Sequence, residues 1–414
     1  MRTAAVIGGG VAGPVVAMAL QRAGIDAVIY ESRAHDAGDI GAFITVQVNG
    51  LDALRAIGAG GVVGELGFET PHLKFRSGTG KRLGVAGTGM PLADGTVGRT
   101  LLRSDLYRAL RDEAMRRGIR VEYGRSLVNA KQTSDGVIAE FADGTTARAS
   151  VLIGADGIRS RVRSLIDPQA PSARYVPKLN IGGFARLSGI DCKPGDYEMI
   201  FGRSCFFGYT LAPNGDLWWF ANPPYPNEPA PGALRNVSDA QWRAMLRHHL
   251  SRDRGPALRI IDATTAPVFA WPTYDIPSIP HWYRDRMVII GDAAHATSPA
   301  SGQGASMAIE DGVELARCMR DLSEPREAFA AFERLRRARV ERVVDTGNKW
   351  SNSKAVGPIG RVVRDLILPF MVRYYSGDGG ASLSWMHHYH IDWDERVTAP
   401  TTLGPAIRSA LQST

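Results

Sequence analysis

One stretch near the N-terminus decides the fold: Ala4-Ala5-Val6-Ile7-Gly8-Gly9-Gly10-Val11-Ala12-Gly13. A short apolar strand runs directly into glycines with the spacing Gly8, Gly10 and Gly13, and these open a helix predicted over 11–23. A second apolar strand follows and ends at Glu31, about 20 positions after the glycines. This order of strand, glycine turn, helix, strand and acid is the dinucleotide-binding fingerprint.

Each part of the fingerprint has a physical task. Gly8 permits the tight turn, Gly10 lets a pyrophosphate lie against bare backbone, and Gly13 lets helix and strand touch. Glu31 can accept hydrogen bonds from the hydroxyls of an adenosine ribose. Arg33 follows closely, and the sequence leaves open whether it contacts adenosine or phosphate or is a solvated loop residue.

A second strand, loop and helix lies in the last third of the chain, over 287–312. Its buried strand runs into Gly291-Asp292, and the loop that follows contains Pro299. The next helix is predicted to begin near Gln303 among small residues. Because the first N–H groups of a helix lack partners within the helix, this segment is suited to bind negative charge or a polarised ring.

A third apolar strand, over 147–153, is followed by Asp156-Gly157 and a helix. Taken alone, it fits any turn between a strand and a helix. Arg103 lies just before another predicted helix, whose N-cap is expected to be Ser104. From that position Arg103 could reach a cofactor.

Between Arg174 and Trp271 short strands dominate, which predicts a second domain built on a sheet. By period-two alternation, Phe207 and Tyr209 share one face of a strand, and Trp218 and Phe220 share one face of the next. Core packing is the default interpretation of such residues. Aromatic residues on both faces exceed the need of one small core, so one face is predicted to line a pocket.

Composition bounds the class of protein. The 414 residues are 44% hydrophobic and 22% charged, as in globular proteins with full cores. No apolar run reaches the roughly 20 residues that span a bilayer, and the chain starts directly as a strand. We therefore expect a cytoplasmic protein without a membrane partner. The net charge of +7 comes from arginines interleaved with acids, which favours attraction of anionic dinucleotides over nucleic-acid binding.

Neither a disulfide framework nor a metal site is predicted. Cys192, Cys205 and Cys318 are scattered and lack paired spacing. The tail contains several histidines, among them His387, but no carboxylate spacing that supports a metal site. A long charged helix is predicted over 325–351 and an amphipathic helix over 357–375.

Together these motifs resemble the single-component, class A flavoprotein monooxygenases, the group that contains p-hydroxybenzoate hydroxylase, salicylate hydroxylase, urate hydroxylase and the tetracycline-inactivating monooxygenases. The resemblance covers roughly residues 1–345 and is carried by Gly8, Gly10, Gly13 and Glu31, by Asp156-Gly157 with Arg159, Ser160 and Arg163, and by Gly291-Asp292 with Pro299 and Gly302-Gln303-Gly304.

The resemblance implies an α/β fold with a Rossmann-like FAD-binding domain, an inserted β-sheet substrate domain and a C-terminal helical segment. The FAD-binding domain is expected over 1–72, 99–173 and 276–345, the substrate domain over 73–98 and 174–275, and the helical region over 346–414.

The resemblance also implies roles for individual residues. Arg103 would contact the ribityl or phosphate region of FAD, Asp292 would bind the ribitol hydroxyls, and Pro299 would lie near the isoalloxazine edge. Asp156 would serve the FAD site, and Gly41 and Ala42 would lie where a mobile flavin passes. The amides of Gly302, Gln303, Gly304 and Ala305 would face flavin N1 and O2.

The implied reaction is hydroxylation or epoxidation of an aromatic or polycyclic small molecule. NAD(P)H would reduce FAD, and O2 would add to give a C4a-hydroperoxyflavin. Phe207, Tyr209, Trp218 and Phe220 would line the substrate pocket, with Tyr209 contacting a substrate hydroxyl. Few charges there favour a natural-product or antibiotic-like substrate. A monomer or weak homodimer is expected.

Alternative functions are a flavin-dependent reductase, a halogenase-like enzyme, and a non-catalytic flavin-bound sequestering module. The halogenase signature Trp-x-Trp-x-Ile-Pro is absent, and Trp271-Pro272 does not match it.

Overall fold

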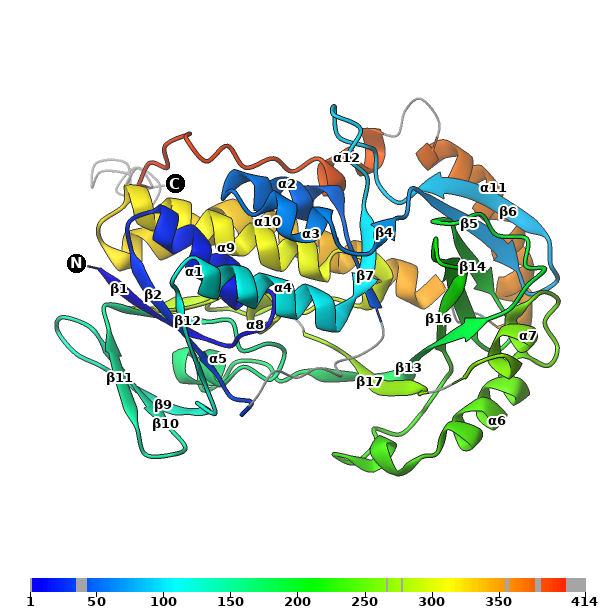
Figure 1. The fold of residues 1–414 in the computed structure, drawn as a ribbon, viewed down its shortest axis with the longest axis horizontal. Helices are drawn as coiled ribbons and strands as arrows, with labels where there is room; N and C mark the ends of the chain where they lie inside the picture. Colours follow the sequence, from blue (N-terminus) through cyan, green and yellow to red (C-terminus); the bar gives the residue numbers. More distant parts are fainter. Residues whose placement is uncertain are drawn as a thin grey trace, which may run out of the picture.

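The computed structural model describes residues 2–34, 43–265, 267–276, 278–353, 357–376 and 381–399. Two halves, each built on a large sheet, lie side by side in an elongated molecule (Figure 1). One half contains the N-terminus and the other contains the strands drawn in green. Within the described chain, no helix is long and apolar enough to cross a membrane.

The first half contains a six-stranded sheet in the order β18-β19-β12-β1-β2-β8. All pairs are parallel except the β18–β19 pair at one edge. Val6 of β1 pairs with Ile29 on one side and Ile153 on the other, so the fingerprint strand is central. The strands are β1 (Thr3–Ile7), β2 (Asp26–Glu31), β8 (Arg120–Tyr123), β12 (Val151–Gly154), β18 (Tyr283–Arg284) and β19 (Met287–Ile289).

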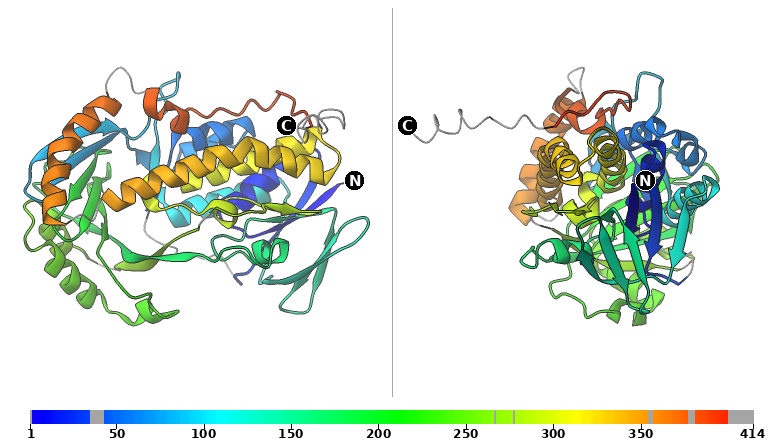
Figure 2. Two further views of the ribbon diagram at one scale, coloured as in Figure 1. Left: turned by 180° about the vertical axis from the view of Figure 1, so that it is seen from behind. Right: turned by 90° about the vertical axis from the view of Figure 1, so that its left-hand side faces the viewer.

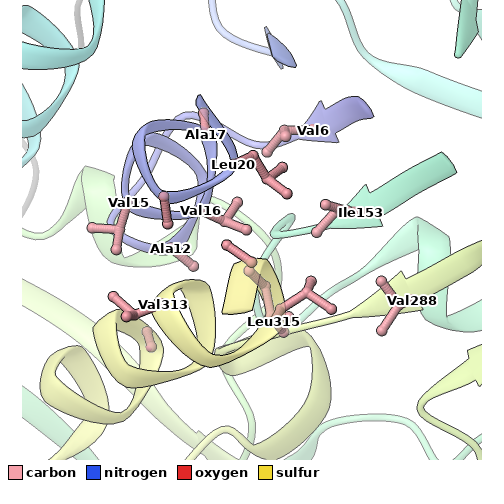
Figure 3. Packing of buried hydrophobic residues seen from close by; sticks show 14 of the residues in the cluster. Val6, Ala12, Val15, Val16, Ala17, Leu20, Ile153, Val288, Val313 and Leu315 are labelled. Carbon is pink, nitrogen blue, oxygen red and sulfur yellow. The ribbon is translucent and has the colours of Figure 1, made fainter. Parts of the chain in front are cut away.

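Helices α1 (Ala12–Arg22) and α9 (Gly304–Asp321) cross closely over this sheet. A Cβ at Gly312 would lie 2.9 Å from the backbone nitrogen of Val16, so only glycine permits this approach. Figure 3 shows the core that the two helices share with the strands, including Val15, Val313, Leu315, Ile153 and Val288. The fingerprint helix and the helix after Asp292 are thereby fixed relative to each other.

The second half contains a seven-stranded sheet in the order β17-β13-β16-β15-β14-β5-β6, antiparallel except between β14 and β5. Helices α6 (Asp239–Leu250) and α7 (Ala257–Asp262) supply its buried core on one face. The strands are β5 (His72–Ser77), β6 (Arg82–Gly87), β13 (Arg174–Arg186), β14 (Tyr197–Phe201), β15 (Phe206–Leu211), β16 (Asp216–Asn222) and β17 (Phe269–Asp275).

Two three-stranded sheets and further helices complete the described chain. The small sheets have the orders β3-β7-β4 and β11-β10-β9. Their strands are β3 (Phe43–Val46), β4 (Phe68–Glu69), β7 (Arg99–Leu102), β9 (Leu127–Gln132), β10 (Val137–Phe141) and β11 (Thr146–Ala149). The other helices are α2 (Val48–Ala56), α3 (Gly60–Gly64), α4 (Arg103–Arg116), α5 (Arg161–Ile166), η1 (Ala233–Asn236), α8 (Asp292–His295), η2 (Pro299–Ser301), α10 (Pro325–Ser353), α11 (Pro358–Ser376) and α12 (Ala381–His387).

The predicted α/β class is confirmed by the parallel sheet with its covering helices. The predicted helix after Pro299 is confirmed as α9, whose N-cap residue is Gln303. The predicted cap at Ser104 is wrong. Helix α4 begins two residues earlier than that cap predicts, at Arg103, and its N-cap is Leu102, which makes no side-chain cap bond.

Candidate active site

The glycine turn has the geometry of a phosphate cradle. Gly8 has a φ of +110°, and a Cβ there would lie 2.3 Å from the carbonyl oxygen of Ala155. A Cβ at Gly13 would lie 1.9 Å from the oxygen of Gly8. Gly10, in contrast, has no described atom within 4 Å of an added Cβ. Two glycines are thus required by packing, and the third leaves bare backbone for a ligand.

Glu31 is held beside this turn. Its carboxylate accepts hydrogen bonds from the backbone N–H of Gly9 at 2.7 Å and of Arg33 at 3.0 Å. It also accepts from Ser32 Oγ at 3.3 Å. Because a carboxylate offers about four acceptor positions, Glu31 keeps capacity for a ribose hydroxyl. The side chain of Arg33 is exposed.

Asp156 uses its carboxylate to cap α5. It accepts from Ser160 Oγ at 2.6 Å and from the backbone N–H of Arg161 and Val162 at 2.7 and 3.0 Å. Burial raises the pKa of Asp156, and these donors offset part of the rise. Its observed role is structural, and the FAD contact implied by the resemblance stays a prediction.

Arg163 connects the second motif to the third. Its guanidinium is buried and donates to the carbonyl oxygens of Ala293 at 2.9 Å and Ile158 at 2.8 Å. Burial lowers the pKa of Arg163. Through Arg163, the segment that follows the Asp156 turn therefore holds the backbone of Ala293, the residue next to Asp292.

Asp292 stands at the start of α8, directly after Gly291, whose φ is +60°. Its side chain is exposed in the described chain, although the surrounding protein still raises its pKa by desolvation. The charge of Arg103 lowers that pKa in part. Arg103 donates to the Tyr107 hydroxyl at 2.7 Å, whereas its buried Nε has no described partner. An exposed carboxylate beside an unsatisfied guanidinium N–H fits a ligand with both hydroxyls and phosphates.

The loop before α9 alternates buried and exposed positions. Pro299 and Gly302 are exposed, while Ser298, Ser301 and Gln303 are buried. Since α9 begins after Gln303, the backbone N–H groups of its first turn have no partners within the helix. Gly304 and Ala305 belong to this turn. Its partial positive charge suits a ring edge that carries negative charge.

A buried polar network that the sequence did not reveal lies behind this loop. Asn49 Nδ2 donates to Gln303 Oε1 at 2.9 Å, and Gln303 Nε2 lies 3.1 Å from His387 Nδ1. Gln47 is also buried, and its Oε1 has no partner among the described atoms. A Cβ at Gly302 would lie 3.5 Å from Gln47 Nε2. Polar residues alternating with valines over 46–49 were the available signal.

An uncharged aromatic cluster covers the face of the seven-stranded sheet that is turned toward β3. Trp218 lies 5.6 Å from Phe43 and 5.5 Å from Phe184, measured between ring centroids. Phe220 lies 6.2 Å from Phe43, and Phe269 lies 6.3 Å from Phe184. Trp218 and Phe220 thus share one half-buried surface, as predicted from their spacing.

Phe207 and Tyr209 lie on the opposite face, so the prediction that they line the same pocket as Trp218 is wrong. The register pairs Tyr209 with Trp219, and residues paired across strands share a face. Phe207 stacks on Trp219 at 5.9 Å in the core covered by α6 and α7. Burial, with the charge of Glu198 second, raises the pKa of Tyr209 far above its usual value. Tyr209 is a core residue.

Two predicted site residues, Gly41 and Ala42, lie outside the described residues; Phe43 follows them directly.

No group of three or more His, Cys, Asp or Glu in the described ranges could hold a metal ion.

A twisted parallel sheet with this glycine turn defines a dinucleotide-binding protein, and comparison with known proteins identifies the kind. A family model described as FAD binding domain matches residues 1–347. The chain is 31% identical over 372 residues to aurachin C monooxygenase/isomerase of Stigmatella aurantiaca, covering 87% of this chain and 90% of that protein. It is 29% identical over 370 residues to 6-hydroxynicotinate 3-monooxygenase of Pseudomonas fluorescens, covering 84% and 91%.

Among solved structures, the HpxO protein of Klebsiella pneumoniae complexed with FAD and uric acid has the same fold. Its TM-score is 0.81 at 24% identity, over 93% of this chain and 96% of that one. The chain belongs to the FAD-binding family of class A flavin monooxygenases. It is a flavoprotein monooxygenase with FAD as cofactor.

Replacing Asp292 by Ala is expected to weaken FAD binding about 10- to 100-fold, because a hydrogen bond to a charged group contributes roughly 1.5–3 kcal/mol. The side chain is exposed, so the apoprotein should remain folded. Fluorescence titration of apoprotein with FAD measures the effect. The exposed Asp262, which pairs with Arg247, provides an Asp262→Ala control. Unchanged FAD affinity in Asp292→Ala would remove Asp292 from the site.

Proposed function

We propose that this enzyme hydroxylates a neutral, electron-rich aromatic ring that carries a hydroxyl, oxo or ring-nitrogen group. The observation that supports this most is the aromatic cluster on the face of the seven-stranded sheet that is turned toward β3. In the described part of the chain, every ring in contact with Trp218 belongs to a phenylalanine, namely Phe43, Phe68 and Phe184. Such a surface favours a flat apolar ring over a free carboxylate.

The names of several relatives support a nitrogen heterocycle. Two of them act on 6-hydroxynicotinate and on urate. A third, from Mycobacteroides abscessus, is a 2-heptyl-3-hydroxy-4(1H)-quinolone synthase. Other relatives hydroxylate 3-hydroxybenzoate or 3-amino-4-hydroxybenzoate. Arg186 of β13, whose guanidinium could otherwise bind a substrate carboxylate, pairs with Asp216 at 2.8 Å. We therefore place the carboxylate-bearing substrates second.

Residues of this chain would bind and orient the cofactor. Glu31 would accept from the adenosine ribose, Arg103 would contact the phosphate or ribityl region, and Asp292 would accept from the ribitol. The residues before and within the first turn of α9 would direct their N–H groups at the pyrimidine edge, with Pro299 beside the ring. When bound and reduced, FAD supplies the activation of O2.

Further residues would bind the substrate ring and keep its surroundings dry. Trp218 and Phe220 would contact the ring, and Phe184 would fix the orientation of Trp218. Gln47 Oε1 would accept from an N–H or O–H of a bound ring, because a buried acceptor without a partner is costly. Excluding water there protects the reaction and holds the reacting carbon in place.

The experiment is oxidation of NADPH and NADH with a panel containing an alkyl-free 4-quinolone, a hydroxyquinoline, 6-hydroxynicotinate and 3-hydroxybenzoate. We expect the two neutral rings to stimulate turnover most, with one labelled oxygen atom from heavy-isotope O2 in the product. Turnover by the benzoate alone would contradict the substrate class. A product that lacks the added, labelled oxygen atom would favour the reductase alternative. A halogenated product would favour the halogenase, and absence of turnover would favour the sequestering module.

Trp218→Ala is expected to lower kcat/KM for the preferred ring at least tenfold, mainly through KM, because it removes a large apolar contact. Tyr283→Ala, at the edge strand β18 of the other large sheet, removes a half-buried ring away from the aromatic cluster and serves as the control. Steady-state kinetics of NAD(P)H oxidation measure both. An equal effect of the two substitutions would contradict the placement of the substrate.

A further inference from the structure

Helix α11 (Pro358–Ser376) carries a row of exposed apolar side chains along its outer side. Ile359 is 82% exposed and Phe370 is 76% exposed. We call the row the apolar stripe; its members are Ile359, Val362, Val363, Leu366, Ile367, Phe370, Met371 and Tyr374. Their spacings of three and four residues place them on one side of the helix. Figure 2 shows α11, in orange, along the outer edge of the molecule.

The apolar stripe is not needed to hold α11 in place, because the inner side of the helix does this. Val372 is buried and would lie 2.6 Å from a Cβ at Gly84 of β6. Leu368 packs with Phe201 and Phe206, and the guanidinium of Arg364 lies 4.7 Å from the Phe201 ring centroid. A helix docked on one side with a long apolar row on the other is typical of a binding surface.

The charge beside the apolar stripe is positive. Helix α11 contains three arginines, Arg361, Arg364 and Arg373, and one acid, Asp365. Asp365 pairs with Arg364 at 2.8 Å, so these two charges compensate each other, and the Arg361 guanidinium donates to the carbonyl oxygen of Arg203 at 2.6 Å. Arg373 is exposed. Strand β6, against which α11 packs, begins with the exposed Arg82, whose guanidinium lies 3.6 Å from the exposed Asp191. A partner surface for this helix is therefore expected to be apolar inside and anionic outside.

A second copy of the chain fits this surface poorly. The helix has 19 residues, so a stripe roughly 28 Å long and 10 Å wide offers only about 300 Å². A stable interface needs about 800 Å² from each partner. Pairing two α11 helices would also bring the exposed Arg373 of each copy into the contact. Like charges at that contact oppose self-association.

We propose that α11 docks on the surface of an anionic lipid bilayer. The apolar stripe enters the boundary between head groups and acyl chains, and the exposed Arg373 contacts lipid phosphates. The seven-stranded sheet with its aromatic cluster then lies next to the bilayer through β6. This proposal departs from the expectation, based on the sequence, that the protein has no membrane partner.

The test uses the FAD-loaded full chain and vesicles that sediment. One set contains equal amounts of phosphatidylglycerol and phosphatidylcholine, and the other contains phosphatidylcholine alone. We expect most of the protein to sediment with the anionic vesicles, little with the neutral ones, and less as salt is raised. Recovery of the protein in the supernatant with both sets would overturn the proposal.

Matched variants assign the contact to α11. The double variant Ile367→Ser, Phe370→Ser is expected to lower partitioning onto anionic vesicles at least tenfold, and Arg373→Gln about fivefold. Met115→Ser on α4 is the control, because Met115 is 43% exposed, as is Met371. All variants should keep bound flavin and an unchanged Tm. A wild-type dimer in light scattering that becomes monomeric in the double variant would overturn the proposal in favour of a second copy.

Discussion

Replacement of Arg336 by Met is expected to lower the free energy of unfolding by about 3–5 kcal/mol, the usual cost of leaving a buried charge without its partner. Arg336 on α10 is fully buried and lies 2.6 Å from Glu310 and 2.8 Å from Asp311, both also fully buried on α9. Although burial opposes its charge, the two carboxylates raise the pKa of Arg336 well above its usual value. The guanidinium therefore remains charged at any pH at which the protein folds.

The Arg336→Met substitution is also expected to affect the predicted FAD site. Asp311 Oδ2 also accepts from the backbone N–H of Gly291 at 2.8 Å, directly before Asp292. Without Arg336, Asp311 keeps only His295 Nε2, at 2.5 Å, as a charged partner, and we expect its carboxylate to shift toward it and to disturb that backbone. We expect Arg336→Met to release FAD more readily as well as to unfold earlier. Arg336→Lys should rescue little, because an ammonium cannot bridge two carboxylates with a planar fork.

Denaturant unfolding of the FAD-saturated protein measures the change. Arg247→Met is the control, because the pair of Arg247 with Asp262 is half exposed at 2.6 Å and such pairs contribute at most about 1 kcal/mol. If both variants lost the same small amount, the buried ion pairs of Arg336 would not have the importance assigned to them.

The parts of the site that the sequence predicted depend on local chemistry. The conformation of Gly8 and the start of α9 at Gln303 follow from residues a few positions away, and both are seen in the structure. The position of the exposed Asp292 after a buried strand is equally local. Turn and helix-end signals are short-ranged, so one sequence is enough to place them.

The errors arose where pairing between distant segments decides. Alternation placed Phe207 and Tyr209 on one face, but the register with β16 determines which face that is. The sequence assigned no role to the tail histidine His387, because its neighbour is the amide of Gln303, 84 positions earlier. The amphipathic pattern over 357–375 predicted the helix, but not that its apolar stripe faces outward.

The second large effect concerns pH and His387. Burial is the main cause that lowers the pKa of His387 to about 4, with contributions from His388 and Arg339 and opposition from Glu310. The unfolded chain binds a proton on this histidine near pH 6.5, well above the folded chain. Stability from the neutral imidazole is therefore fully present above pH 6.5 and is lost as pH falls toward 4, by on the order of 3 kcal/mol.

Hydrogen-bond directions explain why the imidazole must be neutral. Asn49 lies 2.6 Å from a Glu310 carboxylate oxygen, which only accepts, so Asn49 presents its NH2 group there. The same NH2 group donates to Gln303 Oε1, which turns Gln303 Nε2 toward His387 Nδ1. Nδ1 must then accept this hydrogen bond. A proton on Nδ1 would place two donors, Nδ1–H and the Gln303 NH2 group, in contact without an acceptor. Gln303 precedes the first turn of α9, so acidification should loosen the segment proposed to face the flavin.

Melting temperatures between pH 7.5 and 4.5 test this, with FAD release as a second readout. His387→Gln should flatten the fall in Tm over this window, because a glutamine oxygen can accept from Gln303 without titrating. The exposed His248→Gln is the control and should keep the wild-type slope. Since Gln303 Nε2 needs an acceptor and not a charge, rescue by glutamine together with a flat profile separates titration of His387 from simple loss of packing. A wild-type pH slope in His387→Gln would place the acid sensitivity elsewhere, and the arrangement of Gln303 would then depend on Asn49 and Glu310 alone.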